Sequence, residues 1–271
     1  MTRKITYMIL THKNIDHIYK LASEMPDSNF YIHIDLKADI TQVRKDLLNV
    51  ENIFFVENRV DIKWAGFSMV QATLNLMNYA LQHDTQNEYF HLISGDDVIL
   101  KKEQVWDDST IYMECRESVE HRYRMRFNTP HADTQYQRSI FGKFLTQGYK
   151  FLDKLFPSTE KFYFGSQWFS IRREQLQKIL NSISVEDIVF FRKKLCPDEH
   201  FFQYLVIKNS LLANISSLGN KRFIIFDENY QRGSSPIFLT AQHLLQAKSE
   251  QYWFARKVEQ KVMYEFYNIG K

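Results

Sequence analysis

The chain is poor in glycine and cysteine. It has eight Gly among 271 residues, and no spacing among them gives a GxGxxG or Walker A motif. This excludes phosphate binding by a glycine-rich loop. The two cysteines, Cys115 and Cys196, lie far apart and form no CxxC pair. We therefore expect reduced thiols rather than a disulfide or zinc framework.

Long apolar runs and a strong charge of one sign are also missing. No segment approaches the roughly 20 apolar residues that a membrane-spanning helix needs. The N-terminus leads directly into the strand-like run Ile5–Leu10, without the apolar stretch and small-residue cleavage site of a signal peptide. The net charge of +3 is too small to indicate nucleic-acid binding. We expect a cytoplasmic protein that does not bind nucleic acid.

Aromatic residues, in contrast, are abundant, with 22 Phe, 15 Tyr and 4 Trp. Such side chains pack cores and also stack on sugars and bases. The hydrophobic fraction of 44% and the charged fraction of 25% are those of an ordinary globular protein. Because the chain has no repeat and no low-complexity linker, we expect a single domain over residues 1–271.

The first hundred residues alternate between strand and helix patterns. The expected strands cover 5–10, 30–34, 53–56 and 90–93, and the expected helices cover 14–23, 40–48 and 68–81. Ser68 and Gln71 have the spacing of a capping box at the start of the last helix. This alternation predicts an α/β fold with a mostly parallel sheet flanked by helices.

Ligands of such sheets bind at the carboxyl ends of the strands. Thr11, Asp35 and the segment Ser94–Asp97 each follow an expected strand. We therefore expect these residues to share one rim of the sheet. Asp35 is either a turn residue or an acceptor for a nucleotide base or ribose. Asp96 and Asp97 form either a turn or a pair of metal-binding carboxylates.

The second half has less regular patterns. Arg122, Arg124 and Arg126 alternate with apolar residues, which predicts a strand with three guanidinium groups on one face. Such a stripe is either a solvated face or an anion site. Other expected elements are a helix over 140–155, a strand over 162–171, helices over 173–180 and 197–208, a strand over 223–226, and two helices over 240–247 and 252–265.

Pro197-Asp198-Glu199 is the segment that best fits acid–base chemistry. Proline suits the first position of a helix, so both carboxylates would lie in its first turn, where the helix dipole favours anions. They either cap the helix or supply a general base, because a carboxylate at a helix start stays ionised. Elsewhere, Trp168 is either a core residue or a sugar platform. Arg256 and Lys257 are either surface residues or ligands of a diphosphate.

Several of these segments occur together, in an order that resembles a known family. They are Ile9–Lys13, Phe30–Lys37, Val60–Ala72, Tyr89–Lys101, Gly165–Phe169, Cys196–Phe202 and Phe254–Lys257. Together they span nearly the whole chain and resemble the core-2/I-branching family of glycosyltransferases (glycosyltransferase family 14). That family includes animal β-1,6-N-acetylglucosaminyltransferases and peptide O-xylosyltransferases.

The resemblance implies a GT-A-like nucleotide-sugar-binding fold and a role for individual residues. Glu199 would be the catalytic base. The nucleotide-binding residues would be Thr11, Asp35, Trp64, Ser94, Arg232, Arg256 and Lys257. Those on the acceptor side would be Asp97, Gln167 and Trp168. Residues 1–105 would form the nucleotide-binding half, and 106–271 the acceptor-binding and catalytic half.

The implied reaction is an inverting transfer of a sugar, for which we expect GlcNAc, from a UDP-sugar to a glycan hydroxyl, forming a β-linkage. No cofactor and no metal are expected. Animal members are disulfide-rich and membrane-anchored, so this chain is similar to a bacterial, cytoplasmic version. It would act on a glycan or lipid-linked glycan in surface-polysaccharide or lipopolysaccharide synthesis, with peripheral contact at the inner membrane. Two alternatives stay open: a metal-dependent transferase that uses Asp96 and Asp97, and a non-catalytic glycan- or RNA-binding module.

Overall fold

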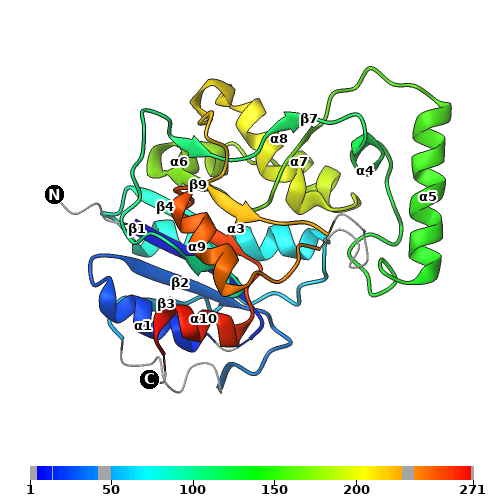
Figure 1. The fold of residues 1–271 in the computed structure, drawn as a ribbon. Helices are drawn as coiled ribbons and strands as arrows, with labels where there is room; N and C mark the ends of the chain where they lie inside the picture. Colours follow the sequence, from blue (N-terminus) through cyan, green and yellow to red (C-terminus); the bar gives the residue numbers. More distant parts are fainter. Residues whose placement is uncertain (1–4, 14, 42–49, 228–234, 270–271) are drawn as a thin grey trace.

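The computed structural model describes residues 5–13, 15–41, 50–227 and 235–269 (Figure 1). Its main feature is a six-stranded sheet in the order β3-β2-β1-β4-β9-β6. The strands are β1 (Ile5–Thr11), β2 (Asn29–Ile34), β3 (Ile53–Phe55), β4 (Tyr89–Ser94), β6 (Ile111–Tyr112) and β9 (Ser170–Arg172). Strands β1 to β4 pair in parallel, and β9 is antiparallel to β4 and to β6. The predicted mostly parallel sheet is confirmed.

Helices cover both faces of this sheet (Figure 1). In β1 every residue is buried, and successive side chains point to opposite faces. Tyr7 and Ile9 belong to a core formed with α1 (Asp16–Glu24), α9 (Ala241–Ser249) and α10 (Gln260–Tyr267). Met8 and Leu10 belong to a second core. That core is formed with α3 (Phe67–His83), α6 (Arg173–Asn181) and α8 (Phe201–Lys208).

The remaining elements are short, apart from one helix. They are β5 (Val98–Ile99), β7 (Arg116–Glu117), α4 (Arg122–Arg126), α5 (Ile140–Leu155), β8 (Tyr163–Phe164), α7 (Val185–Phe191), β10 (Arg222–Ile224) and β11 (Phe254–Arg256), with 3₁₀ turns η1 (Pro197–Glu199) and η2 (Leu212–Asn214). No helix in the described ranges is long and apolar enough to cross a membrane.

A small second sheet, ordered β10-β11-β5, brings the end of the chain back to the main sheet. Strand β11 pairs in parallel with β10 and antiparallel with β5. Strand β5 follows the turn after β4, and the N–H of Val258 donates to the carbonyl of Asp96 (3.0 Å). The segment Arg256–Lys257 is thereby fixed beside that turn.

Several sequence-based predictions need correction. Residues 122–126 form helix α4, not a strand. The expected strand over 162–171 is two short strands, β8 and β9, in different sheets. The expected helix over 252–265 is strand β11 followed by α10. The helix expected from Pro197 begins as the turn η1 and continues as α8.

The capping box at Ser68 is also wrong, whereas most helix predictions are confirmed. Helix α3 begins at Phe67 with Gly66 as its N-cap. Ser68 donates instead to Asp133 Oδ1 (2.5 Å) and accepts from the N–H of Lys63 (2.7 Å). Helices α1, α5, α6 and α9 match their predicted positions. The predicted cap Asn14 and most of the predicted helix 40–48 lie outside the described residues.

Asp84, at the end of α3, joins four elements. Its carboxylate accepts from Thr6 of β1 (2.6 Å) and Asn29 of β2 (3.0 Å), and pairs with Arg173 of α6 (3.2 Å). Only 1% of the Asp84 side chain is exposed. Removing it would leave buried donors and a guanidinium without their acceptor.

We expect Asp84→Ala to lower the free energy of unfolding by about 3–5 kcal/mol, because it breaks a buried ion pair from one side. Urea denaturation followed by circular dichroism measures the change. Asp27→Ala is the control, since Asp27 is exposed, and it should change stability by no more than about 0.5 kcal/mol. Equal stabilities of the two variants would contradict this role of Asp84.

Candidate active site

A cleft of about 330 Å³ opens at the carboxyl ends of β1, β2 and β4. Its lining includes eight of the residues to which the family resemblance assigns a role: Thr11, Asp35, Trp64, Ser94, Gln167, Trp168, Arg256 and Lys257. These residues come from segments far apart in the chain. The cleft therefore brings together the strand ends, an aromatic platform and two cations.

The closeness of β1 and the turn after β4 depends on a glycine. The N–H of Gly95 donates to the carbonyl of Leu10 (3.0 Å). A Cβ at Gly95 would lie 2.4 Å from Oγ1 of Thr11, so a side chain there would force the two segments apart. Glycine is needed here for close approach of two backbones.

Asp35 lies at the end of β2, where its own loop braces it. Its carboxylate accepts from the N–H of Lys37 (3.0 Å) and pairs with the Lys37 ammonium (3.2 Å). Arg59 donates to the carbonyls of Ile34 (3.0 Å), Asp35 (2.7 Å) and Ala38 (2.6 Å). These hydrogen bonds fix the backbone of the loop after β2. The Asp35 carboxylate is therefore held in place at the edge of the cleft.

Arg256 is held between a carboxylate and an aromatic ring. Its Nη1 lies 3.1 Å from Oδ1 of Asp97, and its guanidinium carbon lies 4.3 Å from the centre of the Trp168 ring. A cation over the face of an indole is attracted to the ring electrons. Trp168 thus both lines the cleft and orients one of its cations.

Asp97, which the resemblance places on the acceptor side, is buried in the structure. Only 1% of its side chain is exposed. Its carboxylate accepts from the N–H of Ser94 (2.9 Å) and from the Ser94 hydroxyl (2.8 Å). Asp97 is therefore a buried brace beneath the cleft that aligns Arg256.

Asp96 has a different environment, because it pairs with two ammonium groups. Lys13 lies 3.1 Å from Oδ1 and Lys257 lies 3.4 Å from Oδ2. Partial burial acts against ionisation, but these two lysines outweigh it and lower the pKa of Asp96. Both carboxylates of the candidate metal pair thus already hold cationic partners. Among the described residues, no group of three or more His, Cys, Asp or Glu side chains has the arrangement of a metal site.

Glu199 lies in η1, which follows Cys196 in a left-handed conformation (φ 48°). Its carboxylate pairs with Arg124 of α4, with 2.5 Å between Nη1 and Oε2, and 36% of its side chain is exposed. The guanidinium of Arg124 is largely buried, with 14% of its side chain exposed. A buried cation thus fixes a carboxylate that stays accessible to solvent.

Glu199 does not itself line the cleft with Lys257. The segment 165–168 connects the two regions. The N–H of Gly165 donates to the carbonyl of Glu199 (3.0 Å), and Trp168 and Gln167 line the cleft. Glu199 is therefore joined by a backbone hydrogen bond to the segment that supplies Gln167 and Trp168 to the cleft. Arg232 lies outside the described residues.

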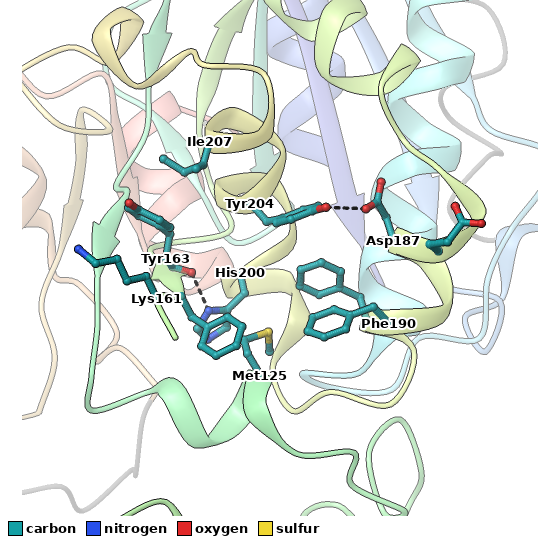
Figure 2. A pocket seen from close by; sticks show the side chains of 11 residues that line it. Met125, Lys161, Tyr163, Asp187, Phe190, His200, Tyr204 and Ile207 are labelled. Atoms are coloured by element: carbon teal, nitrogen blue, oxygen red, sulfur yellow. Dashed lines mark hydrogen bonds between the residues drawn. The ribbon is translucent and has the colours of Figure 1, made fainter. Parts of the chain in front are cut away.

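A second cavity has a volume of about 460 Å³, and His200, the residue after Glu199, is one of the residues that line it (Figure 2). Figure 2 shows aromatic side chains around most of it, with Lys161 and Asp187 at its edges. The Nδ1–H of His200 donates to the carbonyl of Tyr163 (2.7 Å), and burial lowers the pKa of His200 to about 3. Although this cavity is larger, it lacks the strand ends and paired cations of the cleft, so the cleft is the better candidate for charged ligands.

Sequence reasoning missed two residues of this region. Lys13 lies two residues after Thr11, which the sequence analysis places at a strand end, so its position in the chain indicates the same rim. Arg124 was interpreted as part of a strand. Arg124 and Glu199 are 75 positions apart in the chain, so no local sequence pattern predicts their contact.

Asp198 is the buried neighbour of Glu199. Burial, followed by the charge of Glu199, raises the pKa of Asp198 from 3.8 to about 7, and its Oδ1 has no hydrogen-bond partner among the residues that the structure describes. Between about pH 4 and pH 7 the folded protein keeps this proton while the unfolded chain releases it. The stability therefore decreases as pH rises through that window.

We expect Asp198→Asn to remove most of this decrease, because the amide cannot ionise. Wild-type stability should fall from pH 5 to pH 8 by roughly 2–4 kcal/mol more than that of the variant. Urea denaturation across this pH range tests the difference, with the exposed Asp27→Asn as control. A variant that retains the full wild-type pH dependence would show that Asp198 is ionised in the folded state.

Comparison with known proteins adds independent information. Residues 5–245 match the family model of the Core-2/I-Branching enzyme. A probable β-1,3-galactosyl-O-glycosyl-glycoprotein β-1,6-N-acetylglucosaminyltransferase 7 from Homo sapiens is 24% identical over 212 residues, which is 73% of this chain and 48% of that protein. The corresponding enzyme 3 from Rattus norvegicus is 24% identical over 74% of this chain and 46% of its own length. The chain thus spans about half the length of these curated relatives.

Among solved structures, a nucleoside-diphosphate-sugar pyrophosphorylase from Vibrio cholerae matches with 12% identity and a TM-score of 0.35, over 75% of this chain and 88% of its own. A likeness this low assigns neither fold nor function. The family match, in contrast, covers most of the chain. The chain belongs to the Core-2/I-Branching enzyme family.

Proposed function

We propose that this protein is an inverting glycosyltransferase with a GT-A-like fold. It transfers GlcNAc from a UDP-sugar to a hydroxyl of a glycan acceptor and forms a β-linkage. The observation that carries the proposal is the convergence of Thr11, Asp35 and Ser94 with Arg256 and Lys257 in one cleft. The relatives' names support GlcNAc as the sugar.

The donor would lie along the strand ends. The Asp35 carboxylate can accept a hydrogen bond from the imide N–H of uracil, and Thr11 and Trp64 lie in the same cleft. The diphosphate would then reach Arg256 and Lys257. Arg256 offers a planar fork that Asp97 already orients, and Lys257 offers a point charge. A diphosphate would compete with Asp96 for the Lys257 ammonium.

The chemical step needs a base on one side of the anomeric carbon and charge stabilisation on the other. Glu199 would remove the proton from the acceptor hydroxyl, whose oxygen then attacks the anomeric carbon from the face opposite to UDP. The C–O bond to UDP breaks, and Arg256 and Lys257 stabilise the charge that develops on the diphosphate. Gln167 and Trp168, between the two regions, would contact the acceptor.

Metal independence is part of the proposal. Arg256 and Lys257 could neutralise the leaving diphosphate, and both candidate metal carboxylates already pair with lysine or arginine. The acceptor that we propose is a surface glycan or a lipid-linked precursor of one.

Glu199→Gln and Lys257→Met should have different effects. We expect Glu199→Gln to lower kcat by roughly 10²–10⁴-fold, because the amide cannot accept the proton, and to leave the Kd of UDP unchanged. Lys257→Met should weaken UDP binding as well as turnover. The measurements are calorimetric titration with UDP and release of UDP from UDP-GlcNAc with a panel of glycan acceptors.

Both assays are run in excess EDTA and then with added Mn²⁺. Activity that EDTA abolishes and Mn²⁺ restores would favour the alternative in which Asp96 and Asp97 hold a metal. Near-wild-type turnover of Glu199→Gln would remove Glu199 from its role as base. Salt-sensitive RNA binding without an effect of UDP would favour a non-catalytic module.

Arg124 positions the proposed base without contacting the cleft. Arg124→Met should lower kcat by about 10–100-fold, since a small displacement of a catalytic group has this effect, and leave the Kd of UDP unchanged. Arg124→Lys should recover part of the rate, because it retains a charge near Glu199. An equal loss in both variants, or weaker UDP binding in either, would point to a general disturbance of the fold.

A further inference from the structure

Helix α5 turns its apolar face away from the protein. Figure 1 shows this helix at the edge of the molecule, alongside α4 and apart from the central sheet. Phe144, Phe141 and Phe151 are 74%, 66% and 63% exposed. A surface helix normally packs its apolar side against the core. Here that side meets solvent.

The residues of α5 divide into three arcs around the helix axis. At 100° per residue, the outward apolar residues form one continuous stripe: Ile140, Phe141, Phe144, Leu145, Phe151, Leu152 and Leu155. The inner arc, at positions 142, 146, 149 and 153, contains the two buried residues, Gly142 and Asp153. The third arc is basic and borders the apolar stripe, with Lys143, Lys150 and Lys154.

The charges of α5 that reach solvent are all positive. Its one carboxylate, Asp153, is buried and pairs with Arg122 (3.0 Å) and Arg126 (3.1 Å) of α4. Lys143 and Lys154 form no ion pair within the part of the chain that the structure describes. An apolar stripe edged by free lysines complements a surface that is apolar inside and negative at its boundary.

We propose that α5 docks the protein on an anionic lipid bilayer. The helix would lie in the plane of the membrane, with the phenylalanines among the acyl chains and the lysines at the headgroup phosphates. A second copy of the chain fits less well, because antiparallel pairing of two α5 helices would bring lysines of like charge together. The proposal concerns a surface away from the cleft and does not depend on the chemistry proposed there.

The attachment of α5 gives this docking a consequence for the site. Polar bonds to α4 hold the inner arc: Arg122 and Arg126 donate to Asp153, and Arg122 also donates to the carbonyl of Ser158 (2.7 Å). The same short helix α4 carries Arg124, which pairs with Glu199. Docking α5 would therefore hold the Glu199 region at a set distance from the bilayer.

Co-sedimentation with vesicles tests the proposal on the full chain. The vesicles contain phosphatidylcholine alone or phosphatidylcholine mixed with phosphatidylglycerol. We expect the wild type to bind the mixed vesicles, and added salt to weaken this binding. Phe144→Ser/Phe151→Ser and, separately, Lys143→Gln/Lys154→Gln should each lower the partition coefficient at least about tenfold.

Leu218→Ser/Leu245→Ser is the matched control, since both leucines are exposed (59% and 66%) and lie outside α5. Its partition coefficient should equal that of the wild type. Circular dichroism confirms that each variant is folded, and light scattering gives the oligomeric state. The proposal is overturned if the wild type does not bind the mixed vesicles, or if both α5 variants bind as well as the wild type. A dimer that the phenylalanine substitutions dissociate would assign α5 to a second copy instead.

Discussion

The position of one guanidinium group determines the shape of the candidate active site. Arg256 is held by Asp97 on one side and by the ring of Trp168 on the other. Asp97 is in turn fixed by both donors of Ser94, at the end of β4. The main sheet, the small sheet and the segment 165–168 therefore meet at this one side chain. A cation set in place by packing and by buried hydrogen bonds needs little reorganisation when an anion arrives.

The cations around the cleft have carboxylate partners before any ligand binds, but they outnumber them. Asp96 pairs with both Lys257 and Lys13, and Asp97 pairs with Arg256, which leaves a net charge of +1 on these five groups. Partly exposed pairs such as Lys257–Asp96 contribute little to stability, so an incoming diphosphate can exchange with them at modest cost. The buried Arg256–Asp97 pair is different, because separating it would leave a carboxylate uncompensated in the interior. One cation can thus move to the ligand while the other stays fixed.

The sequence predicts this rim better than it predicts the rest. Strands β1, β2 and β4 are buried on both faces and therefore appear as short apolar runs, and the rule that ligands bind at their carboxyl ends places Thr11, Asp35 and Ser94 together. Strand β11 escapes prediction because its partners, β10 and β5, lie far away in the chain. In the sequence, Asp97 has the pattern of an accessible turn residue. In the structure it is buried and pairs with Arg256, which is distant in the chain. Such long-range contacts leave no mark on a local pattern.

The five residues of α4 show how the side-chain periodicity of a short segment determines which partners its residues reach. Arginines at 122, 124 and 126 would share one face of a strand, but on a helix Arg124 turns about 160–200° away from the other two. Arg122 and Arg126 consequently reach Asp153 of α5, while Arg124 reaches Glu199. A segment of five residues is too short to distinguish the side-chain periodicity of a strand from that of a helix. The buried Asp153 stabilises the helix, because it gives Arg122 and Arg126 a common ion-pair partner. The same geometry links the exposed apolar helix to the proposed catalytic carboxylate through a single turn and a half of backbone.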